Sequence, residues 1–260
     1  MDAKAPYDLL GNIALVKFSR ETKANDKKKF ADNLLKKNKS VATVLEKTGG
    51  FKGRLRKQET KWVAGVKTKE AIYRENNCIF RFNLDSVYFS SRLSNERKEI
   101  AKMIRKGDKV FVMFAGAAPF SIVIARNSKA DIVYSNEINK KANEYGRLNA
   151  ELNKVKNKII FFDGDIKRVA KKIKNKFDVI VMPRPQLKDS FLKEAFMLSR
   201  KGTRIFYYDF CKEDDMDKVV NKVKSESVRY RHKIKVLGIK KAGEIAAYRY
   251  RIRVDFKMLN

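Results

Sequence analysis

The chain has 260 residues, which is enough to bury the core of one large domain or of two modest ones. It carries 61 lysines and arginines against 30 aspartates and glutamates, for a formal charge of +31. Such a charge concentrates polyanions and predicts a nucleic-acid partner, while solvated basic surfaces or a membrane-surface role are the alternative explanations. Two cysteines far apart (Cys78, Cys211) give no disulfide framework, and with one histidine (His232) a zinc site and Ser-His-Asp catalysis lack their usual donors.

The first residues lack the apolar core of a signal peptide, and no stretch approaches the roughly twenty apolar residues of a membrane span. We therefore expect a soluble, cytoplasmic protein with structural thiols and with His232 as a polar surface residue. No heptad pattern or apolar stripe indicates a dimer, so we expect a monomer.

Residues 1–76 predict a small α+β domain. Residues 24–47 place apolar side chains at helical spacing before the Gly49-Gly50 break, which predicts a helix. The strand-like runs of this part are residues 11–18, 51–58 and 60–67.

Residues 77–260 predict a larger domain, because apolar strands here alternate with charged segments of helix length. That pattern is typical of a mostly parallel sheet with helical crossovers. The expected strands are residues 109–116, 130–137, 159–165, 177–183 and 203–210. Two further runs, 233–239 and 246–258, are joined by a glycine-bearing connection and predict an antiparallel pair at the end of the sheet. The predicted fold class is therefore α/β and Rossmann-like, preceded by the small α+β domain.

Small and acidic residues stand where these strands end. In FAGAAPF (114–120), Gly116 leaves room for a ligand to approach backbone N–H groups. Glu137 follows about twenty residues later, where a carboxylate can accept hydrogen bonds from both ribose hydroxyls of an adenosyl cofactor. Asp165 would face the adenine amino group or cap the next helix. This order predicts that S-adenosylmethionine binds at the carboxyl edge of the sheet.

Four motifs carry a resemblance: GRLRKQETKWVAG (53–65), VYFSSRLSNER (87–97), FAGAAPFSI (114–122) and NEINKKANEYGRLNAELN (136–153). They resemble archaeal and eukaryotic tRNA methyltransferases that modify N1 of the guanosine just 3′ of the anticodon, at position 37. The wybutosine-pathway aminocarboxypropyl transferases are related to that family. The resemblance covers nearly the whole chain and implies a class I S-adenosylmethionine-dependent methyltransferase fold. The extra N-terminal tRNA-elbow domain common in the family has no counterpart, so a core form is expected.

The resemblance also implies roles for individual residues. Glu96 would remove the N1 proton, Arg56 (or Arg54) would face guanine O6, and Arg92 would hold RNA phosphate or organise the site. From the residues alone, Glu96 is equally an acid favoured by the first turn of a helix, and the arginines are equally a solvated basic face. The implied cofactor-binding residues are Tyr88, Arg97, Phe114, Ala115, Gly116, Pro119, Phe120, Glu137, Ile138, Asp165, Ile166 and Pro183. The implied RNA-binding residues are Arg54, Lys57, Lys61 and Arg184, and no metal site is implied.

Two departures from the family pattern keep alternatives open. Val112 stands where the family usually has an aspartate, and Pro183-Arg184-Pro185 replaces an Asn-Leu-Pro or Asn-Pro-Pro loop, with Arg184 expected to take part of the asparagine's role. Methylation of guanosine 37 is the favoured function, with the anticodon stem-loop of tRNA as partner, and whether a wyosine intermediate is also a substrate stays open. Aminocarboxypropyl transfer from the same cofactor and non-catalytic RNA binding on a degenerate fold are the alternatives.

Overall fold

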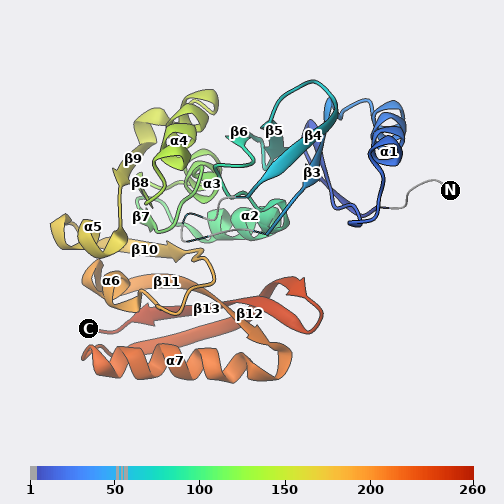
Figure 1. Cartoon of the computed structure of the whole chain (residues 1–260). Coiled ribbons are helices and arrows are strands. Elements are labelled where there is room, and N and C mark those ends of the chain that lie inside the picture. Colours follow the sequence, from blue (N-terminus) through green and yellow to red (C-terminus); the bar gives the residue numbers. More distant parts are fainter. Residues whose placement is uncertain (1–4, 51–52, 54, 56–57) are drawn as a thin grey trace.

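The computed structural model describes residues 5–50, 53, 55 and 58–260. A four-stranded sheet with one helix stands beside a seven-stranded sheet, and a two-stranded hairpin lies between them (Figure 1). This arrangement confirms the predicted fold class: a Rossmann-like α/β sheet that ends in an antiparallel pair, preceded by a small α+β part.

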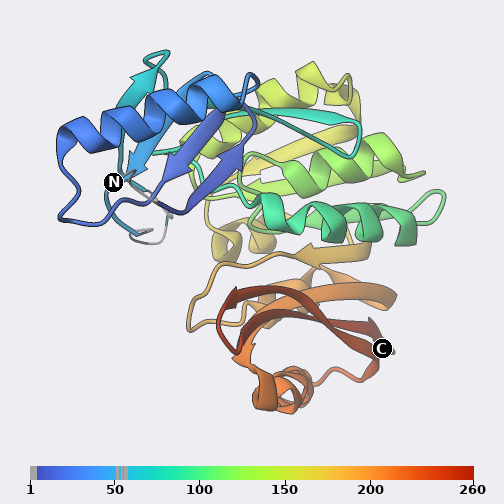
Figure 2. The ribbon, with the colours of Figure 1, turned by 90° about the vertical axis from the view of Figure 1, so that its right-hand side faces the viewer.

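The small sheet has the strand order β1-β2-β3-β4. Its strands are β1 (Tyr7–Leu10), β2 (Ile13–Val16), β3 (Thr43–Lys47) and β4 (Thr60–Gly65). Helix α1 (Ala24–Lys37) connects the parallel strands β2 and β3 and lies across one face of the sheet (Figure 2). Its buried residues Ala31 and Leu34 pack against Val16 and Val44. The small core is therefore built from one helix face and one sheet face.

The helix predicted over residues 24–47 is wrong in its second half, because the helix ends at Lys37 and β3 begins at Thr43. The β-branched residues Val41, Thr43 and Val44 favour extended backbone, and β3 is paired on both sides. The strand predicted at 60–67 is confirmed by β4. Most of the strand predicted at 51–58 lies outside the described residues.

The hairpin consists of β5 (Glu70–Glu75) and β6 (Cys78–Asn83). Two asparagines bind the free edge of β6. One lies in the last turn of α4 (Lys140–Leu152), and the other is the residue that caps its C-terminus. Asn149 accepts from the Arg81 N–H at 2.7 Å and donates to the Arg81 carbonyl at 3.0 Å. Asn153 does the same to Ile79, at 2.9 and 2.6 Å. Two carboxamides thus satisfy the backbone groups that a neighbouring strand would otherwise pair.

The hairpin also contacts the small sheet. Asn12, in the turn between β1 and β2, accepts a hydrogen bond from the Ile72 N–H at 2.7 Å. The neighbouring Gly11 has φ +61°, and a Cβ atom there would lie 1.8 Å from the Ile72 carbonyl oxygen. Only glycine fits this approach. The predicted domain boundary at residues 76–77 lies in the turn of the hairpin, which contacts both sheets.

The large sheet has the strand order β12-β13-β11-β10-β7-β8-β9, with β11, β10, β7, β8 and β9 parallel. Its strands are β7 (Lys109–Val112), β8 (Ile132–Glu137), β9 (Ile159–Asp163), β10 (Phe177–Met182), β11 (Ser199–Lys212), β12 (Ile234–Ala246) and β13 (Arg249–Met258). All five predicted parallel strands and the final antiparallel pair are thereby confirmed. Gly243, predicted in the connection between the last two strands, instead lies inside β12, and Gly238 lies in the strand as predicted. The register of β12 with β13 shifts next to each of these glycines.

Helices cover both faces of the large sheet. The helices are α2 (Ser94–Met103), α3 (Pro119–Asn127), α4, α5 (Ile166–Lys172), α6 (Leu192–Met197) and α7 (Met216–Arg229). Side chains alternate along each strand, so Val110 and Val112 pack under α2, α3 and α4, while Phe111 packs under α5 and α6. The inner parallel strands are therefore buried on both sides, while the edge strand β9 is partly exposed. The loops at the carboxyl ends of the strands are what the sheet offers to a ligand.

Candidate cofactor and RNA site

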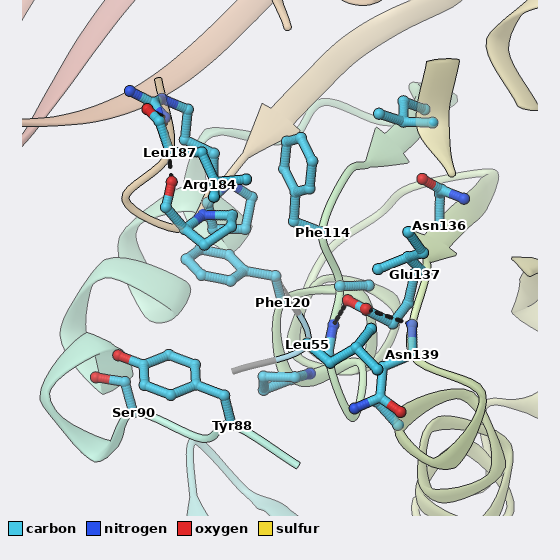
Figure 3. Close-up of a pocket in the computed structure, with 18 of the residues that line it drawn as sticks. Leu55, Tyr88, Ser90, Phe114, Phe120, Asn136, Glu137, Asn139, Arg184 and Leu187 are labelled. Atoms are coloured by element: carbon cyan, nitrogen blue, oxygen red, sulfur yellow. Dashed lines mark hydrogen bonds between the residues drawn. The ribbon is translucent and has the colours of Figure 1, made fainter. Parts of the chain in front are cut away.

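The loops after β7, β8, β9 and β10 surround one cavity at the carboxyl edge of the sheet (Figure 3). All twelve residues predicted to bind the cofactor line it, although they are spread from residue 88 to residue 183 of the sequence. These are Tyr88, Arg97, Phe114, Ala115, Gly116, Pro119, Phe120, Glu137, Ile138, Asp165, Ile166 and Pro183. The structure therefore brings together the whole predicted set.

The Glu137 carboxylate is the polar centre of this cavity. One oxygen accepts from the Gly116 N–H at 2.8 Å, and the other accepts from the Asn139 N–H at 2.8 Å (Figure 3). Burial raises the pKa of Glu137 above its ordinary value, and the backbone hydrogen bonds oppose that rise only in part. The carboxylate is thus fixed in orientation, and its remaining lone pairs are available to hydroxyl donors.

The loop between β7 and α3 presents its backbone to the cavity. Phe114, Gly116 and Ala118 all have positive φ, at 56°, 59° and 63°. Gly116 is the natural residue for that conformation, and a Cβ atom there would point at the Tyr88 carbonyl oxygen, 3.5 Å away. Pro119 then begins α3 at the position that tolerates a missing N–H. This sharp turn directs the Gly116 N–H to the Glu137 carboxylate.

Asp165 lines the cavity, and it also caps the helix that follows β9. Its carboxylate accepts from the Lys167 N–H at 3.0 Å at the N-terminus of α5. The adjacent Asn136 side chain donates to the carbonyls of Phe162 and Gly164, at 2.9 and 3.0 Å. These bonds hold the β9–α5 turn beside the end of β8.

The remaining wall is largely apolar. Phe114 packs edge-on against Phe191 with ring centroids 4.9 Å apart, and Ile138, Ile166 and Pro183 complete the surface. A fixed carboxylate suits ribose hydroxyls, an apolar slot suits an adenine ring, and Asp165 can accept from its amino group. The residues present therefore fit an adenosyl cofactor.

Arg97 lines the cavity but is held from behind. Its side chain is 1% exposed and forms an ion pair with Glu75 at the end of β5. It also donates to the Ser90 carbonyl at 2.9 Å, and its guanidinium carbon lies 5.3 Å from the Phe89 ring and 5.7 Å from the Phe120 ring. The geometry gives Arg97 a role in shaping the cavity wall.

Glu96, the implied general base, is not among the residues that line this cavity. It is 4% exposed and lies one layer below, where its carboxylate accepts from the Tyr208 hydroxyl at 2.9 Å and from Arg253 at 2.7 Å. Lys240 lies 3.0 Å from its other oxygen. Burial and the nearby Glu96 charge raise the pKa of Tyr208 well above its ordinary value, so this hydroxyl keeps its proton. In this arrangement Glu96 joins α2 to the last strands of the sheet.

The other predicted catalytic and RNA-binding residues are placed more widely. Arg92 lines a second, adjoining cavity and lies 3.7 Å from Asp8, with its side chain 67% exposed. Lys61 is exposed on β4. Arg54, Arg56 and Lys57 lie outside the described residues.

Arg184 requires a correction as an expected RNA contact. It is 3% exposed, forms an ion pair with Asp209 and donates to the carbonyls of Pro185, Leu187 and Asp189 at 3.0 to 3.2 Å. The guanidinium is thus committed to holding the loop after β10. Its two Nη atoms stiffen that loop from inside, and the side chain is almost fully buried although Arg184 also lines the cofactor cavity.

Val112, the other departure from the family pattern, is fully buried at the end of β7. It pairs with Val181 of β10 and Ser135 of β8. Packing therefore accounts for an apolar residue at this position, and the backbone of the following loop still reaches Glu137.

Several cavity residues had not been singled out from the sequence: Leu55, Ser90, Asn136, Asn139, Phe191, Phe210 and Arg251. Asn139 carried a signal, because an asparagine directly before a helical run is typical of an N-cap, and its side chain accepts from the Lys141 N–H. Phe210 and Arg251 come from strands far along the chain, so only the folded sheet places them at this edge.

No group of potential metal ligands occurs among the described residues, and none of the helices described is long and apolar enough to cross a membrane. Cys78 and Cys211 are both free thiols. His232, predicted to be a surface residue, is instead partly buried, with its ring centroid 5.1 Å from that of Phe196.

The sequence matches a known protein family. A model described as the TRM5/TYW2 methyltransferase domain matches residues 71–237. The chain is 33% identical to the tRNA (guanine(37)-N(1))-methyltransferase Trm5b of Pyrococcus abyssi, over 97% of this chain and 74% of that protein. The crystal structure of that enzyme superposes with a TM-score of 0.86 at 32% identity, covering 98% of this chain and 75% of that one.

Two further relatives are informative. The tRNA (guanine(37)-N(1))/4-demethylwyosine(37)-methyltransferase Taw22 of Nanoarchaeum equitans is 30% identical, over 97% of this chain and 99% of its own length. A structure titled as the complex of aTrm5 and tRNALeu has a TM-score of 0.85 at 27% identity and covers 99% of this chain and 73% of that one.

Proposed function

Because this chain belongs to the TRM5/TYW2 methyltransferase family, we propose that it transfers a methyl group from S-adenosylmethionine to N1 of guanosine 37 in tRNA. The observation that carries the proposal is the cavity at the sheet edge, where Glu137 is fixed by the N–H groups of Gly116 and Asn139. When bound there, S-adenosylmethionine supplies an electrophilic methyl group on a sulfonium. Glu137 would hold the ribose, and Phe114, Ile138 and Ile166 would exclude water from the adenine.

Guanine N1 carries a proton at neutral pH, so the protein must supply a base for that proton and donors for the charge that develops on O6. We propose Glu96 as this base, but its carboxylate is occupied by other donors in the structure. The carboxylate must exchange its present donors, Tyr208, Arg253 and Lys240, for the guanine N–H. Glu96 lies between Leu93 and Arg97 on the chain, and both of these residues line the cavity.

The donor for O6 is proposed at Arg56, following the resemblance. Its chain neighbour Leu55 lines the cofactor cavity, which supports this proposal. Arg92 is proposed to contact RNA from the second cavity, where it is well exposed. Bond formation itself then depends on alignment: the base must be held within near-attack distance of the methyl group.

For the partner, we propose the anticodon stem-loop of tRNA, bound by a monomer of this chain. A charge of +31 and the relative solved with tRNALeu support a tRNA partner, and a tRNA substrate suits a cytoplasmic location. Residues 1–76, with exposed lysines such as Lys61, are proposed to position the RNA, while residues 77–260 hold the cofactor.

A second candidate substrate is 4-demethylwyosine at the same position. The Nanoarchaeum equitans relative bears both activities in its name, and this chain spans 99% of that protein. Aminocarboxypropyl transfer and non-catalytic binding have less support, because both of the sequence relatives described above are named as methyltransferases.

Mass spectrometry of nucleosides tests the proposal. Unmodified tRNA incubated with the protein and S-adenosylmethionine should gain one methyl on guanosine 37, and tRNA carrying 4-demethylwyosine tests the second substrate. A gain of the larger aminocarboxypropyl group, or no gain on either RNA, would refute methyl transfer.

A further inference from the structure

The cofactor cavity continues into the second cavity, of about 520 Å³, which is within the ~300–1,000 Å³ typical of ligand clefts. The second cavity lies among the small sheet, the segment before α2 and the turn between β12 and β13. Residues that line both cavities mark their junction: Tyr88, Phe89, Ser90, Phe210 and Arg251. A nucleobase whose N1 is to meet the cofactor must occupy this junction.

Arg251 is the one cation among these five shared residues. It lies on β13 directly opposite Phe210 of β11, and its guanidinium carbon is 5.1 Å from the Phe210 ring centroid. Stacking on an aromatic ring engages the face of a guanidinium and leaves its in-plane N–H donors free. Phe210 therefore orients the fork of Arg251 without consuming it.

The neighbouring Arg253, in contrast to Arg251, is fully engaged in ion pairs. Arg253 lies two residues further along the same strand and is bound by Glu96, Glu99 and Asp255. Within the described part of the chain, no carboxylate forms an ion pair with Arg251. The Arg251 guanidinium therefore stacks on a ring at the cavity junction without a neutralising carboxylate, and its N–H groups can bind an acceptor on a ligand.

Guanine offers a matching acceptor pair. Its O6 and N7 atoms lie side by side on the edge next to N1, and an arginine fork binds both at once. Adenine presents an amino donor in place of O6, which opposes a guanidinium. A cation at O6 also stabilises the charge that develops there once the N1 proton leaves.

We propose that Arg251 is a specificity-determining residue that binds O6 and N7 of the target guanosine, with Phe210 as its positioning residue. The inference rests on the proposed function, because it requires guanosine as the substrate. It assigns base recognition to the C-terminal strand pair, in addition to the segment around Arg56. Arg251 would thus provide from β13 a base contact of the kind first expected from Arg184, whose side chain is buried in the loop after β10.

The test measures binding of anticodon stem-loops that carry guanosine or 7-deazaguanosine at position 37, since the analogue lacks only the N7 acceptor. The native protein should bind the analogue about tenfold more weakly. Arg251→Gln should bind both loops equally, and Arg251→Lys, which keeps the charge but loses the fork, should retain little of the preference. Lys257→Gln removes a charge from an exposed position on the same strand and should behave as the native protein.

A native protein indifferent to 7-deazaguanosine, or an Arg251→Gln variant that keeps the tenfold preference, overturns the inference. An Arg251→Gln variant that loses the same factor of affinity for both stem-loops also overturns the inference, because a uniform loss describes a phosphate contact. Thermal unfolding of each variant confirms that the protein is folded. Methylation of guanosine 37 by the native protein is scored separately, so failure of the proposed function is told apart from failure of this contact.

Discussion

The Arg97 guanidinium and the Glu75 carboxylate form an ion pair that is almost sealed from solvent, with 1% and 2% of the two side chains exposed. One Nη of Arg97 lies 2.6 Å from Glu75 Oε2 and also donates to the Ser90 carbonyl. Glu75 ends the hairpin strand β5, and Arg97 lies in the first turns of α2. The pair therefore joins the hairpin, the helix and the loop behind the cofactor cavity.

Arg97→Ala should lower the free energy of unfolding by about 3–5 kcal/mol, because it leaves the Glu75 carboxylate buried without a partner. Urea unfolding measures this. The matched control is Lys141→Ala, which breaks an exposed pair with Glu144 and should cost at most about 1 kcal/mol. Equal losses in the two variants would show that the Arg97 pair is no stronger than a surface contact.

Glu137→Gln should weaken S-adenosylmethionine binding by at least about tenfold, since the carboxamide turns a donor toward one of the two N–H groups that now bind the carboxylate. Isothermal calorimetry gives the affinity. Glu144→Gln, an exposed change on α4, should leave it unchanged. Native affinity in Glu137→Gln would remove Glu137 from the ribose site.

The raised pKa of Glu137 has a consequence for stability. The folded protein holds this proton more tightly than the unfolded chain, whose glutamates titrate near about 4.3. The free energy of unfolding that this group contributes is therefore largest below that pH and falls as pH rises through the folded-state pKa. In Glu137→Gln this part of the pH dependence should disappear, which paired urea titrations between pH 4 and pH 7 would reveal as a changing difference from the native protein. A constant difference would contradict the raised pKa.

Glu96→Gln should slow single-turnover methyl transfer by about 10²-fold or more if Glu96 takes the N1 proton, while sparing cofactor affinity. The control is Glu99→Gln, because Glu99 binds the same Arg253 and Lys240 but lies on the exposed side of the network. Both variants should lose some stability, and only Glu96→Gln should lose the chemical step. Equal rates in the two would leave Glu96 with a purely structural role.

Burial raises the pKa of the Cys78 thiol to about 11, so almost no thiolate forms at pH 8. Cys211 is only partly buried, although burial raises the pKa of its thiol as well. Alkylation of the native protein at pH 8 should therefore label Cys211 first, and a Cys211→Ser variant should react only on unfolding. Mass spectrometry of the labelled peptides checks the order; early labelling of Cys78 would contradict its burial.

The parallel strands could be located from the sequence because most of them are apolar runs buried on both faces. Glu137 and Asp165 could be predicted to lie at one cavity because the strand ends at one sheet edge converge whatever the side chains between them. The failed half of the helix at 24–47 shows the limit. Periodicity there suited a helix, but pairing of β3 with both β2 and β4 decided for a strand.

Side-chain direction could not be predicted. Glu96 and Arg97 are adjacent in the sequence, yet one faces the last strands and the other faces the cavity. Arg184 and Arg251 were equally indistinguishable as basic residues, and only Asp209 and Phe210, contributed by β11, separate a buried brace from a stacked, unneutralised cation.

Asn149 and Asn153 have a last consequence, for the outer edge of β6. The outer edge of β6 would otherwise be a bare template on which another polypeptide could add a strand, the usual beginning of misassembly. Carboxamides from α4 occupy that template at Ile79 and Arg81. These hydrogen bonds form only when α4 packs against the hairpin. The edge of β6 is therefore covered in the same folding step that encloses the cofactor cavity, to which α4 contributes.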